Sequence, residues 1–391
     1  MSKTVILSSA RTPVGKLGGG LSTLEATELG AVAIGAALER AGVEPEQVEH
    51  VVMGQVLQAG QGQIPSRQAQ IKAGIPKEVS SETINKVCAS GLRASVMLDQ
   101  AIRAGDMQVG VGGGMESMSK APYLLPQARF GYRMGDAKML DAMVHDGLTN
   151  PFSGKQMFVE ATEVGDELEM TRADLDRWAL RSHERALAAI DEGRMADEIV
   201  PVTVNGRKQA TVVEIDEGPR RDTSLEKLAG LPGLVGKEGS HTAGNSPGVN
   251  DGAGALVLAS EEWASANGKE VLAEIVAHAQ SANDFAYLAT TPASAARKAL
   301  EKAGLQPGDI DLWEINEAFA SVTLNSIRML GIDEERVNVN GGAVALGHPI
   351  GASGARILGS LVHELRRRGG GLGCAAICSG GGQGDALILK V

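Results

Sequence analysis

The most informative stretch of this chain is Asn85-Lys86-Val87-Cys88-Ala89-Ser90-Gly91-Leu92. Part of it recurs near the C-terminus, which indicates that the fold contains two related halves. Ala89-Ser90-Gly91-Leu92-Arg93-Ala94 returns 263 positions later as Ala352-Ser353-Gly354-Ala355-Arg356-Ile357. In the second copy, Gly351 stands where the first copy has Cys88, and His348 lies three residues before it. This asymmetry predicts a two-part active site, with a nucleophile from one half of the chain and its base from the other.

The order of the predicted elements repeats in the same way. Helical periodicity that ends near a glycine marks four segments: 27–41, 90–104, 292–303 and 353–368. Short apolar runs that predict buried strands occur at 4–8, 48–57, 310–315 and 373–377. Glycine triplets at 112–114 and 380–382 lie 268 positions apart, close to the offset of the first repeat. Alternating strands and helices predict an α/β fold, and the repeated order predicts an internal duplication.

Residues 120–249 interrupt this order. They contain aromatic residues, methionines, a charged helix predicted over 174–192 and a stretch rich in Gly and Pro. A segment of this length is not a simple connection. We predict that it is an inserted loop domain that binds substrate and supports oligomer contacts. The two halves would then be residues 1–119 together with 250–267, and residues 268–391.

Composition and charge limit the possible partners. The net charge of −11 argues against nucleic acid, whose phosphates require a clustered basic surface. Arg207-Lys208 and Arg220-Arg221 are local exceptions that could hold a small polyanion or lie in solvent. The three cysteines do not suggest a disulfide framework, and neither a signal peptide nor a run of membrane-spanning length is evident. We expect a cytoplasmic protein with no membrane partner.

Cys88 and His348 are the first candidates for chemistry. A cysteine just before a helix gains from unpaired N–H groups and the helix dipole, which favour the thiolate, although most buried free cysteines are inert. His348 lies in a loop with glycines before it and a proline after it, and imidazole can take a thiol proton at little cost.

Cys378 and Asn316 each follow or end a predicted strand. Cys378 leads into Ser379-Gly380-Gly381-Gly382, whose N–H groups could bind an oxyanion. Asn316 could position a water or a carbonyl, or cap the following helix, and it takes the place of Gln55 in the first half. Cys374 is predicted to be core. No second Cys/His cluster completes a metal site, and the glycine triplets do not match a dinucleotide motif.

Four ordered motifs together resemble the thiolase family, and within it the biosynthetic acetyl-CoA acetyltransferases. They are 85–91 around Cys88, Asn316-Glu317-Ala318-Phe319, 341–354 around His348, and Cys378-Ser379-Gly380-Gly381-Gly382. The resemblance runs from residue 4 to the C-terminus. It implies a five-layered α-β-α-β-α fold of two similar halves and a homotetramer made of two tight dimers.

The resemblance also implies a role for each motif. Cys88 would carry the acyl group, His348 would activate its thiol, and Cys378 would move the proton on the nucleophilic carbon. Asn316 would hold a water that forms one oxyanion hole with the imidazole. The N–H groups of Cys88 and Gly380 would form the other. Acyl-CoA thioesters would be the substrates, with no metal and no cofactor.

Substrate contacts are also carried over from the family. They are Arg220, Ala243, Gly248, Ala318, Phe319, Met157 and Leu148. The chain departs from many short-chain members at Gln156-Met157-Phe158, where those members have His-Met-Gly, and at Pro247, where they have serine. These departures leave the acyl chain length open.

The predicted activity is the reversible condensation of two acetyl-CoA to acetoacetyl-CoA and CoA, as in an acetyl-CoA C-acetyltransferase. A longer-chain 3-ketoacyl-CoA thiolase is the alternative. A ketoacyl synthase would lack the second cysteine, so Cys378 argues against it. A non-catalytic acyl-CoA-binding protein and a cysteine protease fit the four motifs less well.

Overall fold

The computed structural model describes residues 3–206 and 209–391. Its largest sheet has ten strands, which run in the order β12-β13-β14-β11-β1-β10-β5-β3-β4, with β2 (Gly15–Lys16) paired to β10. The two halves of the chain meet where β1 (Thr4–Arg11) pairs with β11 (Ala273–Ala282), through Val5↔Glu274 and Ile6↔Ala273. The sheet is therefore continuous across the duplication.

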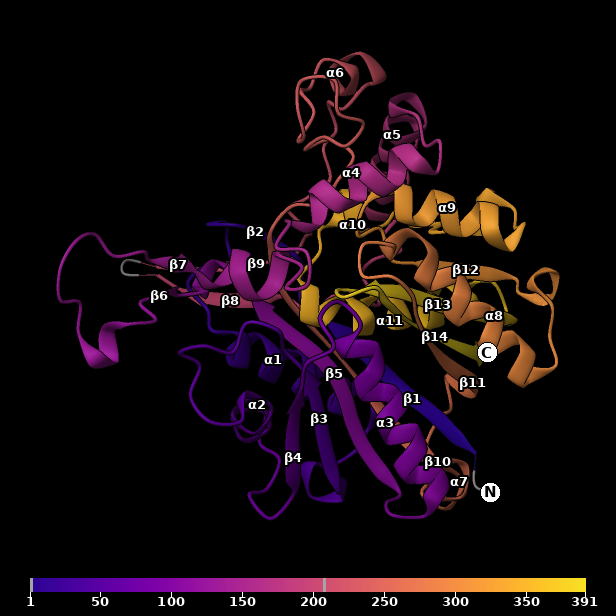
Figure 1. The fold of residues 1–391 in the computed structure, drawn as a ribbon. Helices are drawn as coiled ribbons and strands as arrows, with labels where there is room; N and C mark the ends of the chain where they lie inside the picture. The colour runs from indigo at the N-terminus through magenta and orange to yellow at the C-terminus, as the bar shows by residue number, and fades with distance from the viewer. Residues whose placement is uncertain (1–2, 207–208) are drawn as a thin grey trace.

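The N-terminal half has a mixed sheet between two layers of helices (Figure 1). Its further strands are β3 (His50–Gly54), β4 (Ser80–Ile84), β5 (Val109–Ser117) and β10 (Asn250–Ser260). Helices α1 (Ala26–Ala41) and α2 (Pro65–Lys72) pack on one side, and α3 (Ser90–Ala104) packs on β3, β5 and β10. The helix ends agree with the sequence prediction, since Gly42 and Gly105 follow α1 and α3 in the left-handed conformation.

The C-terminal half repeats this arrangement. Its further strands are β12 (Leu312–Ile315), β13 (Leu372–Ser379) and β14 (Gln383–Lys390). Helix α8 (Thr291–Ala303) packs on β11, β13 and β14, with α9 (Ala320–Leu330) beside it, whereas α11 (Ser353–Arg367) packs on β12 and β13 and against α3. Helices α3 and α11 thus form a central layer, which confirms the predicted α-β-α-β-α order.

The repeated Ala-Ser-Gly motif explains how the two central helices meet. A Cβ atom on Gly354 would lie 2.2 Å from the backbone nitrogen of Leu92, and one on Gly91 would lie 2.8 Å from that of Ala355. Each copy therefore supplies a glycine that lets the start of the other helix approach its backbone. This crossing brings the turn before α3 beside the turn before α11.

The two glycine triplets do not occupy equivalent positions in the two halves, although their spacing in the sequence suggested that they do. Residues 112–114 lie inside β5, where a Cβ on Gly114 would be 2.0 Å from the carbonyl oxygen of Gly351. Residues 380–382 form the turn between β13 and β14, and Gly381 and Gly382 have positive φ. The triplets are therefore not equivalent, and the duplication depends on the element order and the Ala-Ser-Gly repeat. The predicted strand 48–57 is also shorter, since β3 spans His50–Gly54.

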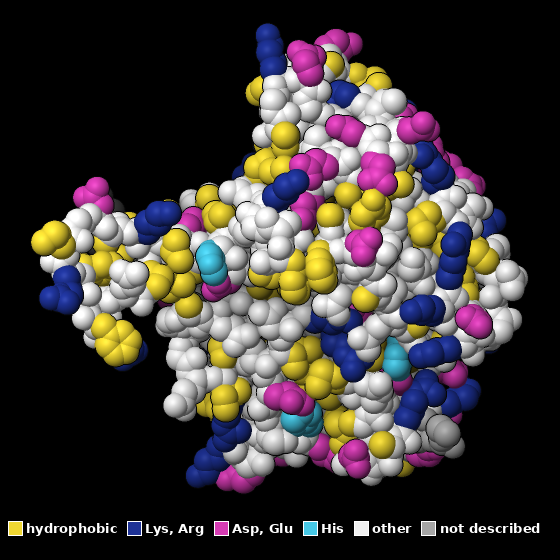
Figure 2. Space-filling view, viewed as in Figure 1, with side chains coloured by type: hydrophobic (Ala, Val, Ile, Leu, Met, Phe, Trp, Pro, Cys, Tyr) yellow, Lys and Arg dark blue, Asp and Glu magenta, His cyan; other side chains and the backbone are white. Residues whose placement is uncertain are grey.

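Residues 120–249 form the additional structure above and beside the halves (Figure 1). Its helices are α4 (Met157–Glu167), α5 (Arg172–Asp191) and α6 (Leu225–Ala229), and its hairpins are β6–β7 (Tyr123–Leu124, Leu140–Asp141) and β8–β9 (Val202–Asn205, Ala210–Val213). The β6–β7 hairpin projects as an arm that carries exposed apolar side chains (Figure 2). Within the described ranges, every helix is too short or too polar to cross a bilayer.

Candidate active site

The nucleophile candidate lies in a strained turn. Cys88 is buried just before α3, and Val87 beside it has φ 45°, a left-handed conformation that β-branched residues avoid. The turn is held by Ser90, whose Oγ accepts a hydrogen bond from Lys86 N (2.8 Å) and donates one to Val87 O (2.7 Å). Asn85 Oδ1 accepts from Val87 N at 2.9 Å. Such strain is typical of functional sites, and the sequence alone did not reveal it.

The histidine turn is braced by the equivalent serine of the second copy. Ser353 Oγ lies 2.6 Å from His348 Nδ1 and donates to Pro349 O at 3.1 Å. Since that hydroxyl has one hydrogen, its oxygen accepts the proton of Nδ1, which leaves the lone pair on Nε2. Nε2 is buried without a hydrogen-bond partner, and the backbone N–H of His348 donates to Asn250 Oδ1 at 2.8 Å. The imidazole is therefore oriented to act as a base through Nε2.

Cys88 and His348 line one apolar cavity of about 340 Å³, which we call the catalytic cavity. Five of the predicted substrate contacts line it as well: Leu148, Met157, Gly248, Ala318 and Phe319. So do the residues at which the chain departs from many short-chain members: Gln156, Phe158 and Pro247. Two turns that are distant in sequence thus converge on one cavity.

The Cys88 thiol is protonated at neutral pH. Burial raises its pKa to about 12, and the charge of Glu116 adds to the rise. The backbone N–H groups of Cys88 and Gly380 act in the opposite direction, because they donate toward the sulfur. These are the two groups predicted to form an oxyanion hole, and the structure aims both at the atom that would carry the acyl group.

His348 is neutral for the same reason. Burial lowers the pKa of its imidazole to about 3, and the charge of Arg356 lowers it further. The resting site is therefore a neutral thiol beside a neutral imidazole. The neutral imidazole could accept the thiol proton when the Cys88 sulfur attacks a substrate carbonyl.

Cys378 lies close to Cys88 but outside the lining of the catalytic cavity. It belongs to the apolar cluster that contains Ala318 and Phe319, which form part of that lining. Burial raises the pKa of the Cys378 thiol well above its usual value, and a charge on Cys88 raises it further. Cys374 is fully buried in a separate apolar cluster, as predicted for a core residue.

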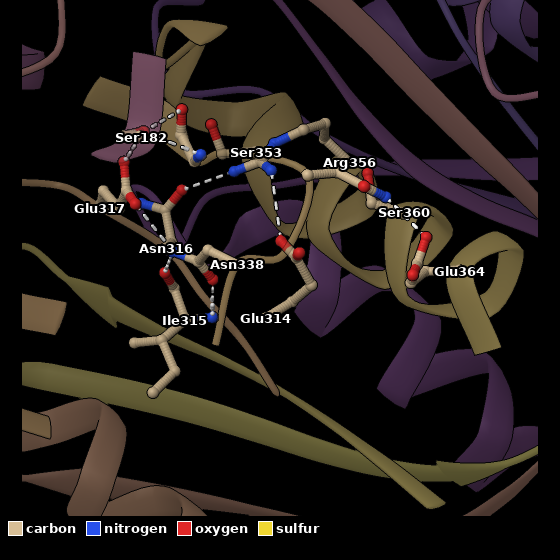
Figure 3. A network of polar contacts seen from close by, with 12 residues as sticks. Ser182, Glu314, Ile315, Asn316, Glu317, Asn338, Ser353, Arg356, Ser360 and Glu364 are labelled. Carbon is tan, nitrogen blue, oxygen red and sulfur yellow. Dashed lines mark hydrogen bonds and ion pairs between the residues drawn. The ribbon is translucent and has the colours of Figure 1, made fainter. Parts of the chain in front are cut away.

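Asn316 is held by a buried ion pair (Figure 3). Arg356 donates from Nη2 to Asn316 Oδ1 and from Nη1 to Glu314, both at 3.4 Å. This contact identifies the amide oxygen and leaves Nδ2 as a buried donor without a hydrogen-bond partner. Nδ2 is the atom that could hold a water. The alternative role as a helix cap is wrong, because Phe319 is the N-cap of α9.

Two buried glutamates hold the site together, and the sequence analysis assigned no role to either. Glu317 accepts hydrogen bonds from two residues of α5, Trp178 Nε1 (2.9 Å) and Ser182 Oγ (2.8 Å). It also accepts them from Asn338 Nδ2 (2.9 Å) and from Val344 N (2.9 Å) in the short helix α10 (Ala343–Leu346). Figure 3 shows Ser182 and Asn338 beside Glu317. These contacts join the end of β12 to α5 and to the segment before the histidine. Glu116 accepts from Val56 N (3.0 Å), Leu57 N (3.1 Å) and Gly351 N (2.9 Å). Glu116 thereby joins the two halves beside the histidine turn, and burial raises its pKa to about 7.

A second cavity of about 260 Å³ adjoins the catalytic cavity, and we call it the basic cavity. Arg220, Ala243 and Gly248 line it, as do Lys16 and His183. The two cavities share the lining residues Ser246, Gly248 and Val249. The N–H of Arg220 donates to His183 Nδ1 at 3.2 Å.

Of the two basic pairs in the sequence, only one can be placed. Arg220 lines the basic cavity, whereas Arg221 pairs with Asp191 at the surface. Arg207-Lys208 lies outside the described residues.

Comparison with known proteins identifies the family to which this chain belongs. The family models for the N-terminal and C-terminal domains of thiolase match residues 4–262 and 269–391. The chain belongs to the thiolase family. The crystal structure of the Bacillus anthracis acetyl-CoA acetyltransferase superposes on this thiolase with a TM-score of 0.98, at 42% identity, covering 100% of this chain and 99% of that one. The predicted family and fold are confirmed.

Curated relatives cover the chain from end to end. The acetyl-CoA acetyltransferase of Pseudomonas aeruginosa is 49% identical over 390 residues, covering 100% of this thiolase and 99% of the relative. The probable acetyl-CoA acetyltransferase of Mycolicibacterium smegmatis is 48% identical over 387 residues, covering 99% and 100% respectively.

Proposed function

We propose that this thiolase is an acetyl-CoA C-acetyltransferase, which joins two acetyl-CoA to form acetoacetyl-CoA and CoA in a reversible reaction. Its membership of an acyltransferase family and the names of its relatives support the reaction class. The observation that carries the proposal is the catalytic cavity, where the Cys88 thiol and the free Nε2 of His348 share one apolar space. Lys16 and Arg220 in the adjoining basic cavity suit the phosphates of CoA.

The first half of the reaction transfers an acyl group to sulfur. His348 Nε2 takes the thiol proton as Cys88 Sγ attacks the thioester carbonyl carbon. The carbonyl oxygen becomes an oxyanion, which the N–H groups of Cys88 and Gly380 stabilise. The C–S bond to CoA then breaks, and the imidazolium returns its proton to the departing CoA sulfur.

The second half forms the carbon–carbon bond. His348 takes the proton of Cys378, and the Cys378 thiolate removes a proton from the methyl carbon of a second acetyl-CoA. The imidazolium and a water held by Asn316 Nδ2 would stabilise the enolate oxygen. The carbanion attacks the acyl carbon, the bond to Cys88 breaks, and the imidazolium protonates Cys88. These steps use only protons of the chain and its substrates, so we propose that no metal or redox cofactor takes part.

Assembly and location are proposals as well. We propose a homotetramer, because the β6–β7 arm exposes large apolar side chains that a partner would cover. We propose a cytoplasmic location, since the three cysteines are free thiols, which persist in a reducing compartment.

Cysteine variants test the reaction. Cys88→Ser should form no acetyl-enzyme, whereas Cys378→Ala should still be acetylated by acetyl-CoA but should lose condensation. Cys374→Ala is the matched control, because this thiol is equally buried and lies away from the cavity; its activity should stay within about twofold of the wild type. Radiolabelled acetyl-CoA and mass spectrometry measure the acyl-enzyme. Efficient labelling of Cys88→Ser, or normal condensation by Cys378→Ala, contradicts the assignment.

A further inference from the structure

The two N–H groups that point at the Cys88 sulfur come from different halves of the chain. That of Cys88 lies in the turn before α3, and that of Gly380 lies in the turn between β13 and β14. An oxyanion is bound well only when both donors lie roughly 3 Å from its position. The spacing of these two donors therefore depends on the contacts that join the two turns.

The first contact between the two turns is a buried hydroxyl. Ser379, which precedes Gly380, is fully buried and donates from Oγ to the carbonyl oxygen of Lys86. Lys86 lies two residues before Cys88. A Cβ atom on Gly380 would lie 3.3 Å from both Cγ atoms of Val87, so the two turns also pack directly on one another. One hydrogen bond thus joins the two donor segments within two residues of each N–H.

The side chain of Lys86 makes the second contact. Its Nζ lies 2.5 Å from Asp385 Oδ2 and donates to Gln280 Oε1 at 2.6 Å. Asp385 lies on β14, which follows the glycine turn, and Gln280 lies opposite it on β11. The carbonyl of Lys86 holds the last residue of β13, which leads into the same turn. Lys86 therefore grips the glycine turn from both of its strands.

Burial of Asp385 makes the ion pair necessary. The Asp385 side chain is 1% exposed, and residues 386–389 that follow it on β14 are buried and apolar. In the described part of the chain, Lys86 supplies the one cation within 4 Å of this carboxylate. Burial raises the pKa of Asp385, and the charge of Lys86 acts in the opposite direction. A buried carboxylate is costly unless a cation compensates it, so Lys86 is held in this position.

We propose that Lys86, Ser379 and Asp385, which we call the Lys86 bridge, are positioning residues that set the spacing of the two oxyanion-binding N–H groups. The inference rests on the proposed function. As the thiol sulfur attacks the thioester carbonyl, the oxygen gains a negative charge and must receive both hydrogen bonds at once. Without the bridge, the glycine turn would be free to move from the turn before α3, and the oxyanion would keep one good donor.

The bridge therefore acts on the rate of acyl transfer rather than on the binding of CoA, whose phosphates we assign to the basic cavity. Two variants remove it in ways that the fold should tolerate. Ser379→Ala removes the hydroxyl. Lys86→Met combined with Asp385→Val replaces both charges by apolar side chains, so no buried charge is left without a partner, and valine suits a strand.

Acetylation by acetyl-CoA, followed by rapid quench and mass spectrometry, measures the effect. The maximal rate should fall roughly 10- to 100-fold in both variants, which is less than the loss of a whole oxyanion donor costs. The half-saturating concentration of acetyl-CoA should stay within about twofold of the wild type. Acetylation at a maximal rate within about twofold of the wild type in either variant overturns the proposal.

Alkylation of Cys88 by iodoacetamide separates a positioning role from a general structural one. Displacement of iodide forms no tetrahedral oxyanion, so alkylation of both variants should stay within about threefold of the wild type. If the bridge only held the thiol in place, acetylation and alkylation would fall together. Equal losses in the two reactions therefore overturn the proposal.

Two further variants complete the test. Lys86→Arg keeps a cation for Asp385 and should retain acetylation within about threefold; a loss as large as that of the double variant overturns the proposal. Ser281→Ala is the matched control, because Ser281 is a buried serine on β11 whose hydroxyl donates to a carbonyl of another element, Thr291 O, at 2.8 Å. Its acetylation should be unchanged. If Cys88 of the wild type is not acetylated at all, the proposed function itself fails.

Discussion

At the scale of single residues, the candidate site holds its thiol and its imidazole in their neutral forms. A pKa of about 12 for Cys88 and about 3 for His348 means that a thiolate–imidazolium pair does not form at rest. Burial is the main cause of both shifts, since a charged group loses its hydration in the cavity. Ser353 adds the orientation, because its contact with Nδ1 leaves Nε2 as the basic nitrogen.

Ser353→Ala should lower kcat for acyl-enzyme formation roughly 10- to 100-fold with little change in KM, because Nδ1 loses its acceptor and the basic tautomer is no longer favoured. Ser326→Ala is the control, since Ser326 is a buried serine whose hydroxyl bonds only within its own helix, at 2.7 Å to Val322 O. Stopped-flow acylation by acetyl-CoA measures both. An unchanged kcat in Ser353→Ala contradicts the assigned role.

The pH dependence of the wild type follows from the same shifts. Because the pKa of His348 lies below its ordinary value of 6.5, the imidazole stays neutral and basic until the pH falls toward about 3. Titration of His348 should therefore cause no change in the acylation rate from pH 8 to about 5. Glu116→Gln, which removes the neighbouring group with a pKa of about 7, should keep this level profile. A fall centred near pH 6.5 in the rate profile, measured with unfolding monitored in parallel, is the contrary result.

At the scale of elements, the crossing of α3 and α11 brings the turns that carry Cys88 and His348 to one cavity. Gly91 and Gly354 are equivalent positions of the duplication, and each permits the backbone contact from its own side. The serine that precedes each glycine braces the turn before its helix. The repeated motif therefore serves packing in both copies, whereas the candidate catalytic residues Cys88 and His348 precede it.

Gly354→Ala should destabilise the fold by about 1–3 kcal/mol or more, since its Cβ would meet backbone atoms that cannot move aside. Gly35→Ala is the matched control. Gly35 lies within α1 with open space around its Cβ position, so alanine there should stabilise by about 0.5–1 kcal/mol. Urea unfolding measures the two opposite effects. Equal stability of the two variants is evidence against the close crossing.

At the scale of the whole molecule, the features that bear on assembly with further copies of the chain are the two joined halves and the projecting arm. The halves are joined by the β1–β11 pairing and by Glu116. The arm extends away from this body (Figure 1). Its Phe130 and Met134 are almost fully exposed, at 91% and 97%. Large apolar side chains at such a tip are typical of an interface.

Phe130→Asp combined with Met134→Asp should reduce the molar mass in light scattering from that of a tetramer to that of a smaller species, because the buried charges would oppose the contact. Val271→Asp is the control, because Val271 is an exposed apolar residue outside the arm, and it should leave the mass unchanged. If the double variant keeps the mass of the wild type, the arm does not make the tetramer contact.

Much of this molecule could be predicted from local sequence. The helix that begins at Ser90 ends where glycine follows, as expected, and the turns around Cys88 and His348 are evident because glycine, proline and serine determine loops over a few residues. The duplicated order of elements likewise predicted the two halves, which the structure shows.

Tertiary structure alone decided the rest, because the deciding contacts join positions far apart in the chain. The role of Glu116 and the reason for the glycine triplet in β5 depend on neighbours from another element. The same holds for the burial that shifts the pKa values of Cys88 and His348. A linear sequence specifies its turns and helices through nearest neighbours, whereas hydration and close approach are properties of the packed whole.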